Sequence, residues 1–473
     1  MRILQALRLS VAAATAFGLS ACADKWQRPD LKIAKPAGWI DQRTDCPLWP
    51  AANWWSSFGS RELSTLVVEA ERANQDIGAA KGRIEQADAQ VRINGASLIP
   101  VITGDGDTSI QRSAGGQRVA GFQTTLNASY ELDFWGRNRA TLRSAQASAV
   151  SSRFAEEVVA LGVVSDVANV YFALLAAQER LAIARDNVKS SQTVLDAIQG
   201  RLDVGTANGL DVAQQKTIVD QQRATIPPIE QEIRTNQTAL ALLLGRPPVA
   251  LQVKGGRLAQ LKTPRVQPGL PSDLLARRPD VRQAEADLAA TDANVTAARA
   301  AFLPSINLTG QGGFESTGLR TLFSSQTALY SLTAGLTQPI LDATLPGNLD
   351  LAKGQYRENL YAYRKAAIQS FVDTENAIIT VRKSAEQERL QQAATDSARR
   401  AYDIARGQLR EGAIDIVTML AVQQTLFSAQ DALVSTRLAR YQAYVSMFEA
   451  LGGGWSASGQ PAGGAPLPEA AIK

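Results

Sequence analysis

The feature that most constrains this chain is an unbroken helical stretch from about residue 139 to 202. Apolar and small residues recur along it at alternating steps of four and three. They are Val163, Val167, Val170, Leu174, Ala177, Leu181, Ala184, Val188, Ser191, Leu195, Ile198 and Leu202. A heptad pattern sustained in this way specifies left-handed coiled-coil packing. At about 1.5 Å per residue, about 60 helical residues span about 90 Å. The pattern therefore predicts long packed helices rather than an ordinary globular core.

The chain also contains an internal duplication. Residues 74–102 match residues 278–306 without a gap, and the matched positions include prolines, aspartates and alanines. A second correspondence aligns Gly205 with Gly412, and Asn208 with Asp415. A repeat this long is not the short period of a solenoid. We therefore expect two similar structural units in one chain.

Each half is predicted to contain a helix, a β-hairpin, a long helix and a returning helix. The first helix should run from about 61 to 98, where Pro100 ends it, and Pro227-Pro228 should kink the first returning helix. The second long helix has a weaker seam through Leu390, Ala394, Ser397, Ala401 and Ile404. The expected divisions are a signal at 1–21, an N-terminal segment at 22–60, a first repeat at 61–246 (hairpin about 101–133, long helix about 139–202), a linker at 247–269, a second repeat at 270–455 (hairpin about 305–338, long helix about 350–409) and a disordered tail at 456–473.

The N-terminus has the pattern of a secretory signal. Arg2 and Arg8 precede a short apolar stretch that ends in Leu-Ser-Ala-Cys at Cys22. The stretch is too short for a transmembrane helix, which needs about 20 apolar residues. It resembles a bacterial lipoprotein signal, in which the cysteine becomes the lipidated first residue, although an ordinary signal peptide that contains a cysteine is the alternative. Ala23 stands where an aspartate would favour the inner membrane, so we expect lipid at Cys22 and an outer-membrane location.

The predicted hairpins alternate apolar and polar residues. Phe122, Leu126 and Tyr130 alternate with polar residues such as Asn127 and Ser129, and period two is the pattern of a strand with two different faces. Strands of about 9–11 residues can span an outer membrane. A soluble sheet covered by helices on one face is the alternative. Four strands cannot close a barrel, so in lipid two chains would give eight strands and three would give twelve.

Composition excludes several classes of function. The chain has no histidine, which removes His-ligated metal sites and nucleophiles that depend on an imidazole base. Its formal charge is +4, and two of those charges, Arg2 and Arg8, lie in the signal, so no basic stripe for nucleic acid is expected. No phosphate-binding loop or nucleophile elbow is present. We expect no enzyme activity, no metal and no cofactor apart from covalent lipid.

Three motifs resemble those of a known family. They read Tyr-Glu-Leu-Asp-Phe-Trp-Gly-Arg at 130–137, Pro-Gly-Leu-Pro-Ser-Asp-Leu-Leu-Ala-Arg-Arg-Pro-Asp-Val at 268–281, and Leu-Gly-Gly-Gly-Trp at 451–455. In this order they resemble the TolC-like outer-membrane efflux proteins of the OprM-type lipoprotein branch. The resemblance implies a mainly α fold with a membrane β-barrel. It also implies a homotrimer that forms a twelve-helix α-barrel and a twelve-stranded β-barrel, four strands from each chain.

The resemblance further implies a passive exit duct for small molecules in the outer membrane. Such a duct works with a periplasmic adaptor and an inner-membrane pump. The turns at Gly205 and Gly412 would form the inner tip and face the adaptor, although ordinary turn chemistry also explains these glycines. Two alternatives stay open: a coiled-coil scaffold lipoprotein of the envelope, and a periplasmic enzyme or binding protein.

The periplasmic aperture is where this chain departs from its relatives. OprM-like proteins commonly carry Leu-Asp-Ala-Gln after the second tip, whereas residues 420–423 here read Leu-Ala-Val-Gln. We therefore expect Asp211 to be the selectivity acid, with Asp415 second and Val417 nearby. Threefold symmetry would turn either acid into a ring of like charges. The alternative is that both carboxylates only cap helices.

Overall fold

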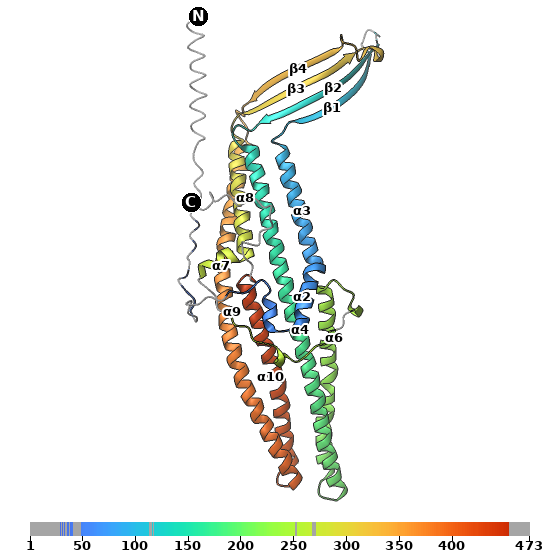
Figure 1. The fold of residues 1–473 in the computed structure, drawn as a ribbon, viewed down its shortest axis with the longest axis vertical. Coiled ribbons are helices and arrows are strands. Elements are labelled where there is room, and N and C mark those ends of the chain that lie inside the picture. The colour runs from blue at the N-terminus through green and yellow to red at the C-terminus, as the bar shows by residue number, and fades with distance from the viewer. Residues whose placement is uncertain are drawn as a thin grey trace. The chain divides into compact units, whose positions relative to one another are not determined.

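A computed structural model describes residues 49–453 except 113–115, 117, 251–252 and 267–270, together with a few positions between 29 and 40. The predictions for the signal, Cys22 and the tail therefore lie outside the described residues. In chain order the elements are η1 (Trp54–Phe58), α2 (Arg61–Ala73), α3 (Gln75–Ala96), β1 (Val101–Arg112), β2 (Arg118–Leu132), α4 (Arg137–Asp203), α5 (Gly209–Ala224), α6 (Ile226–Leu243), η2 (Pro248–Ala250), η3 (Leu258–Gln260), α7 (Pro271–Arg277), α8 (Pro279–Ala300), β3 (Ser305–Ser316), η4 (Leu319–Thr321), β4 (Ala328–Thr337), α9 (Thr344–Glu411) and α10 (Ile416–Ala450) (Figure 1).

The described residues form two compact units. One contains the sheet and consists mainly of residues 84–152 and 284–365, and the other contains most of the helices. Each unit takes segments from both halves of the sequence. The compact units therefore do not coincide with the sequence repeats.

All four strands lie in one antiparallel sheet of order β1-β2-β3-β4. The two predicted hairpins are joined through β2 and β3, where Leu126 lies opposite Gly312 and Tyr130 lies opposite Leu308. Strands β1 and β4 are the two edges of the sheet. The duplication therefore yields one continuous sheet rather than two separate hairpins.

The first predicted helix is interrupted, so the expectation of one helix over 61–98 is wrong. Asn74, between α2 and α3, has an extended backbone with φ −65° and ψ 133°. Its side-chain oxygen accepts hydrogen bonds from the backbone N–H of Asp76 (2.8 Å) and Ile77 (3.2 Å), and its amide donates to the carbonyl of Leu243 (2.9 Å). Asn74 therefore starts α3 as a cap and also ties the break to the end of α6.

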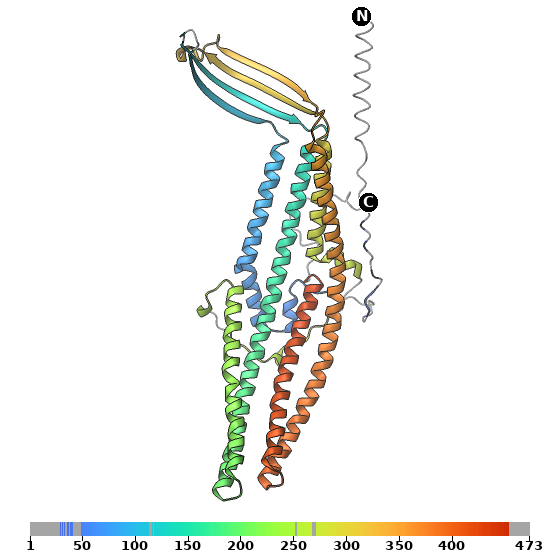
Figure 2. The same cartoon turned by 180° about the vertical axis from the view of Figure 1, so that it is seen from behind.

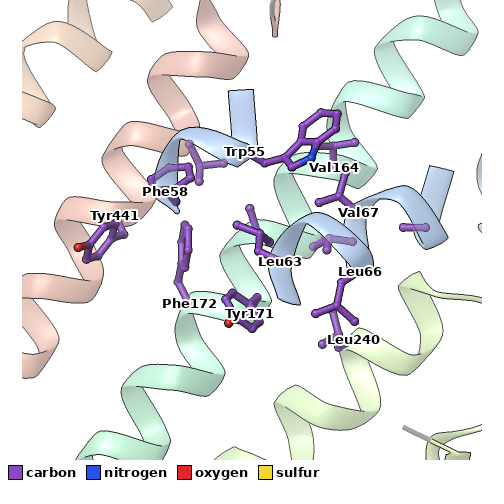
Figure 3. Close-up of a cluster of buried hydrophobic side chains, with 14 of the residues drawn as sticks. Trp55, Phe58, Leu63, Leu66, Val67, Val164, Tyr171, Phe172, Leu240 and Tyr441 are labelled. Carbon is purple, nitrogen blue, oxygen red and sulfur yellow. The ribbon is translucent and has the colours of Figure 1, made fainter. Parts of the chain in front are cut away.

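An aromatic cluster forms the core of the helical unit (Figure 3). Phe58 of η1 is fully buried, and its ring lies 4.9 Å from that of Phe172 on α4. Trp54 stacks on Phe448 of α10 with 4.7 Å between ring centroids. Aromatic side chains bury large areas, and such ring pairs add about 0.5–1.5 kcal/mol beyond burial. The short η1 segment is thereby fixed between α4 and α10.

Of the twelve residues of the heptad seam predicted on α4, seven are buried and five are half-buried. Val167, Leu174 and Ser191 are completely buried, and Ile198 is 3% exposed. This helix also contains a stretch apolar enough to cross a membrane by length and composition, and half of that stretch is buried inside the fold. Since α4 contributes to both large buried clusters of the helical unit, its apolar character matches its packing role.

The seam predicted on α9 is wrong for the packing of this chain. Leu390 and Ile404 are 54% and 62% exposed. The side chains that α9 buries lie next to that seam: Thr395, Ala398, Tyr402, Ala405 and Leu409. Ala398, Tyr402, Ala405 and Leu409 pack in a cluster with residues of α4 and α10. The Thr395 hydroxyl donates to the carbonyl of Ala429 of α10 at 3.0 Å. The predicted seam remains uncovered on the single chain.

Both long helices reverse and continue as returning helices in the helical unit. Helices α5 and α6 return beside α4, and α10 returns beside α9 (Figures 1 and 2). The break between α5 and α6 falls at Thr225, and Pro227 and Pro228 are the second and third residues of α6. Proline is tolerated there because its missing N–H is unpaired at a helix start anyway.

Candidate functional site

The two tip turns share one geometry. Gly205 and Gly412 both have φ +75°, a left-handed conformation that glycine adopts at little cost. After Gly205, the N–H of Thr206 donates to the carbonyl of Arg201, and the N–H of Ala413 donates to Gln408 in the same way. This is the Schellman pattern that ends helices. Turn chemistry therefore accounts for both glycines, and their open surroundings leave them accessible.

Asp211 takes part in a capping box at the start of α5. The side chain of Asn208 accepts from the backbone N–H of Asp211, and the Asp211 carboxylate accepts from the N–H of Asn208 at 3.1 Å. Such reciprocal pairs satisfy two N–H groups that the helix leaves unpaired. Asp211 is half-buried, so its carboxylate has a local structural role while part of it faces solvent.

Asp415 caps α10 at the equivalent tip. Its carboxylate accepts from the N–H of Thr418 at 2.8 Å. Hydrogen bonds from the Thr418 side chain and backbone hold the pKa of Asp415 below its ordinary value. The carboxylate is therefore anionic at neutral pH and exposed. Val417 follows in the first turn and is 58% exposed.

A buried polar group that sequence reasoning missed lies further along these helices. Gln215 of α5, Gln423 of α10 and Ser191 of α4 are all fully buried. The Gln215 amide donates to the carbonyl of Ser191 at 2.9 Å, and the Gln423 amide donates to the Ser191 hydroxyl at 3.1 Å. Buried amides need such partners, so this cluster fixes the three helices relative to one another. The signal that could have found it is a glutamine on the buried face of each returning helix.

The sheet has one apolar and one polar face. The register places Tyr330 and Leu332 of β4 on the same face as Leu126 of β2. These three side chains are 91%, 85% and 64% exposed. The polar residues Asn127, Ser129, Asn307 and Thr333 share the other face by the same register. An exposed apolar face of this length is a surface for lipid.

The polar face is also acidic. The register assigns to it the carboxylates of Asp105, Asp107, Glu131 and Glu315, and none of the strand residues on that face is a lysine or arginine. Asp105 accepts a hydrogen bond of 2.6 Å from the amide of Asn127. Sequence alternation predicted the polarity of this face but not its charge, because the four acids come from three strands and only the register assigns them to one face.

The motif at 130–137 connects the sheet to α4. The Asp133 carboxylate accepts from the backbone N–H of Asn138 (2.9 Å) and Arg139 (3.0 Å) and from the Arg139 side chain (2.9 Å). The Trp135 indole donates to the carbonyl of Pro304 at 2.7 Å. The motif therefore caps α4 and joins the first half of the chain to the start of β3.

No group of three or more Cys, Asp or Glu side chains suited to a metal ion occurs among the described residues. Cys22 lies outside them. What the described part offers is a two-faced sheet with open edges, long packed helices, and carboxylates at the tips.

Comparison with known proteins agrees with this architecture. A pyoverdine export outer membrane protein, OpmQ, from Pseudomonas putida is 36% identical over 443 residues, which are 91% of this chain and 94% of that protein. A structure of CusC, from work on folding and transmembrane channel formation, superposes with a TM-score of 0.82 at 28% identity and covers 90% of this chain and 99% of that one. The outer-membrane channel OprN gives a TM-score of 0.84 at 25% identity, with 91% and 99% coverage.

The duplication is confirmed by the family comparison as well. The model of the outer membrane efflux protein family matches this chain twice, over residues 66–246 and 270–453. The two matches contain the two hairpins and the two long helices in the same order. The chain therefore belongs to the outer membrane efflux protein family.

Proposed function

We propose that three copies of this chain close into one outer-membrane duct that passes small molecules passively out of the periplasm. The observation that carries the proposal is the sheet. Its apolar face is exposed, its other face is polar and acidic, and β1 and β4 are open edges. Open edges are not tolerated in lipid, so the sheet must continue into other copies of the chain.

The uncovered seam on α9 supports the same assembly. Leu390, Ala394 and Ile404 follow heptad spacing and face away from the chain's own buried cluster. A heptad stripe of this kind packs against another helix. A neighbouring copy would cover it, so that the helices of the assembled copies form a closed ring. Three copies, rather than two, follow from the family resemblance.

The duct would not supply energy. Its chain has no motif for nucleotide binding, and a passive channel needs none. We infer that a periplasmic adaptor holds the tips at Gly205 and Gly412 and that an inner-membrane pump drives transport. Relatives named for pyoverdine export and for cation efflux support small solutes as cargo. The chain would act as a conduit and not as an enzyme.

We infer that Asp211 and Asp415 act on permeating ions at the periplasmic aperture in addition to capping their helices. Asp211 and Asp415 each cap a helix, and neither role uses all the lone pairs of a carboxylate. In a trimer each would form a ring of three charges that concentrates cations and weakens as salt screens it over about 10 Å at 0.1 M. Val417 would line the same region as an apolar contact.

Lipid at Cys22 completes the proposal. The signal pattern supports an acyl-modified first residue, and the barrel would give a second hold on the membrane. Mass spectrometry of the mature protein tests this directly. An N-terminus other than Cys22, with that thiol unmodified, contradicts the lipid anchor and leaves the duct proposal untouched.

Conductance in planar lipid bilayers tests the duct. Purified wild-type protein should give discrete, cation-preferring channels, whereas a scaffold lipoprotein would give none. Asp211→Asn, Asp415→Asn and the double variant should reduce the cation preference while the proteins still assemble. Equal selectivity and conductance in all four proteins would remove both acids from the aperture.

A further inference from the structure

The end of the β1–β2 hairpin that lies away from the helices carries a pair of arginines. Arg112 is the last residue of β1 and Arg118 is the first residue of β2. The register places them directly opposite each other, and both are exposed. Directly opposed residues in an antiparallel pair have Cβ atoms about 4.5–5.5 Å apart, and like charges at that distance are unfavourable. The two guanidinium groups therefore form one concentrated positive site.

Nothing in the described structure neutralises this pair. Neither arginine forms an ion pair with any described carboxylate, whereas Arg137 and Arg139 at the other end of the sheet each pair with an acid. The connecting residues 113–117 read Ser-Ala-Gly-Gly-Gln and contain no acid. The acids of this sheet lie on the opposite face. Among the described residues, none supplies the counter-charge of this pair.

The pair lies on the apolar face, at its outer limit. Alternation along β1 places Arg112 on the same face as Ile102 and Ile110, which are 71% and 73% exposed. From Ile102 to Arg112 the strand advances about 34 Å at about 3.4 Å per residue. A strand tilt of about 40° reduces this to a height of about 26 Å, against about 25 Å for the apolar band of an outer-membrane barrel. In a barrel of this height the arginines would lie where the hydrocarbon ends and the lipid headgroups begin.

We propose that Arg112 and Arg118 form a binding site for the phosphate group of an anionic glycolipid in the outer leaflet. The inference rests on the proposed orientation of the sheet in the outer membrane. Guanidinium groups bind phosphate oxygens through paired N–H donors in a fork geometry, and two opposed forks match one phosphate with charge near −2. Ile110, directly below, would contact the acyl chains of the same lipid. That continuity of charged and apolar surface favours a lipid over free phosphate.

The test uses the full-length purified channel in neutral phosphatidylcholine nanodiscs. Lipid A, a bisphosphorylated glycolipid, is titrated, and bound lipid is counted by native mass spectrometry. We expect the Arg112→Gln/Arg118→Gln variant to lose at least about tenfold in affinity. Arg92→Gln is the matched control, because Arg92 of α3 is exposed and has no ion pair among the described residues; it should bind lipid A as wild type does.

Two further arms separate the possible sources of phosphate. Wild type should bind dephosphorylated lipid A as weakly as the double variant binds the intact lipid. Inorganic phosphate at the same concentration should not displace intact lipid A from wild type. Equal binding of lipid A by wild type and the double variant would overturn the proposal. Full displacement by inorganic phosphate would overturn the assignment to lipid. In planar bilayers, wild type and the double variant should show equal conductance. Absence of conductance in wild type would contradict the proposed duct and not the lipid site.

Discussion

Leu126 offers the sharpest test of which face of the sheet contacts lipid. It lies near the middle of β2 (Arg118–Leu132), and its side chain is 64% exposed in the single chain. Its neighbours across the sheet are Gly104 and Gly312. Since both are glycines, a longer side chain at this position would meet no bulky neighbour. Any cost of Leu126→Arg therefore comes from placing a charge in lipid and not from a clash.

The magnitude follows from the depth of the position. An arginine on the lipid face near the bilayer midplane costs about 2–4 kcal/mol. At about 1.4 kcal/mol for each factor of ten, Leu126→Arg should shift the folding equilibrium by about 30- to 700-fold for each chain. Three chains in one barrel would each bear this cost. We expect a large loss of assembled trimer in lipid vesicles and a lower urea midpoint for what remains.

The adjacent residue provides the matched control. Asn127 lies on the opposite face and its amide contacts the carboxylate of Asp105. Asn127→Arg would place a cation beside that acid in the water-filled lumen, so we expect assembly close to wild type and an altered conductance. The assay is semi-native electrophoresis of vesicle-inserted trimers across a urea series. Equal assembly of Leu126→Arg and Asn127→Arg would refute the assignment of the two faces.

Three further predictions concern the helical unit. Arg437→Met should lower the free energy of unfolding by about 3–5 kcal/mol, because it leaves the largely buried carboxylate of Glu179 without a cation and removes one of the two cations of Glu388, which keeps only Arg440. Wild-type stability of this variant in urea would contradict the argument. Burial opposes ionisation of Glu388, but hydrogen bonds from Arg440 and Arg437 hold its pKa below the ordinary value of 4.5. The stability that this carboxylate contributes is therefore present above that pH and is lost as the pH falls through the lower pKa of the folded state. The Arg437 variant should lose less stability on acidification than wild type does. Gln215→Ala should cost about 1–3 kcal/mol by unpairing buried groups, and an unchanged melting temperature would exclude a structural role for the amide. Gly245→Ala should cost at least about 1 kcal/mol, since φ is +63° and the new Cβ would press on the carbonyl of Ala73; full thermal stability of this variant would contradict the argument.

The two long helices show where heptad reading succeeds and where it fails. On α4 the predicted stripe lies on the buried side of the helix, with seven of its residues buried and five half-buried, so the pattern and the packing agree. On α9 two stripes run side by side, and the chain buries the one that contains Tyr402. The stripe through Leu390 and Ile404 is the more aliphatic one. Periodicity identifies such stripes but does not say which partner covers each of them.

The linker shows a second limit. Residues 247–269 were expected only to connect the halves, yet the Glu62 carboxylate accepts from the backbone N–H of Lys254 at 2.8 Å, and Glu179 accepts from Leu258 at 3.1 Å. The Tyr441 hydroxyl donates to the carbonyl of Leu261 at 2.9 Å. Each of these contacts joins a side chain of a helix (α2, α4 or α10) to a backbone group of the linker. Such bonds leave no periodic trace, so the sequence predicts the linker but not its attachment to the helices.

The tips were predictable in their turns but not in their function, and the reason is symmetry. Gly205 and Gly412 are marked by residue type, and the Asn208–Asp211 spacing is the pattern of a capping box. Whether Asp211 also acts on a permeating ion depends on how far it lies from its two copies, a distance that no single chain contains. The same holds for the edges of the sheet and for the uncovered seam of α9. The chain's own residues account for its local structure, while its open edges and uncovered seam are surfaces that acquire partners only in the assembled channel.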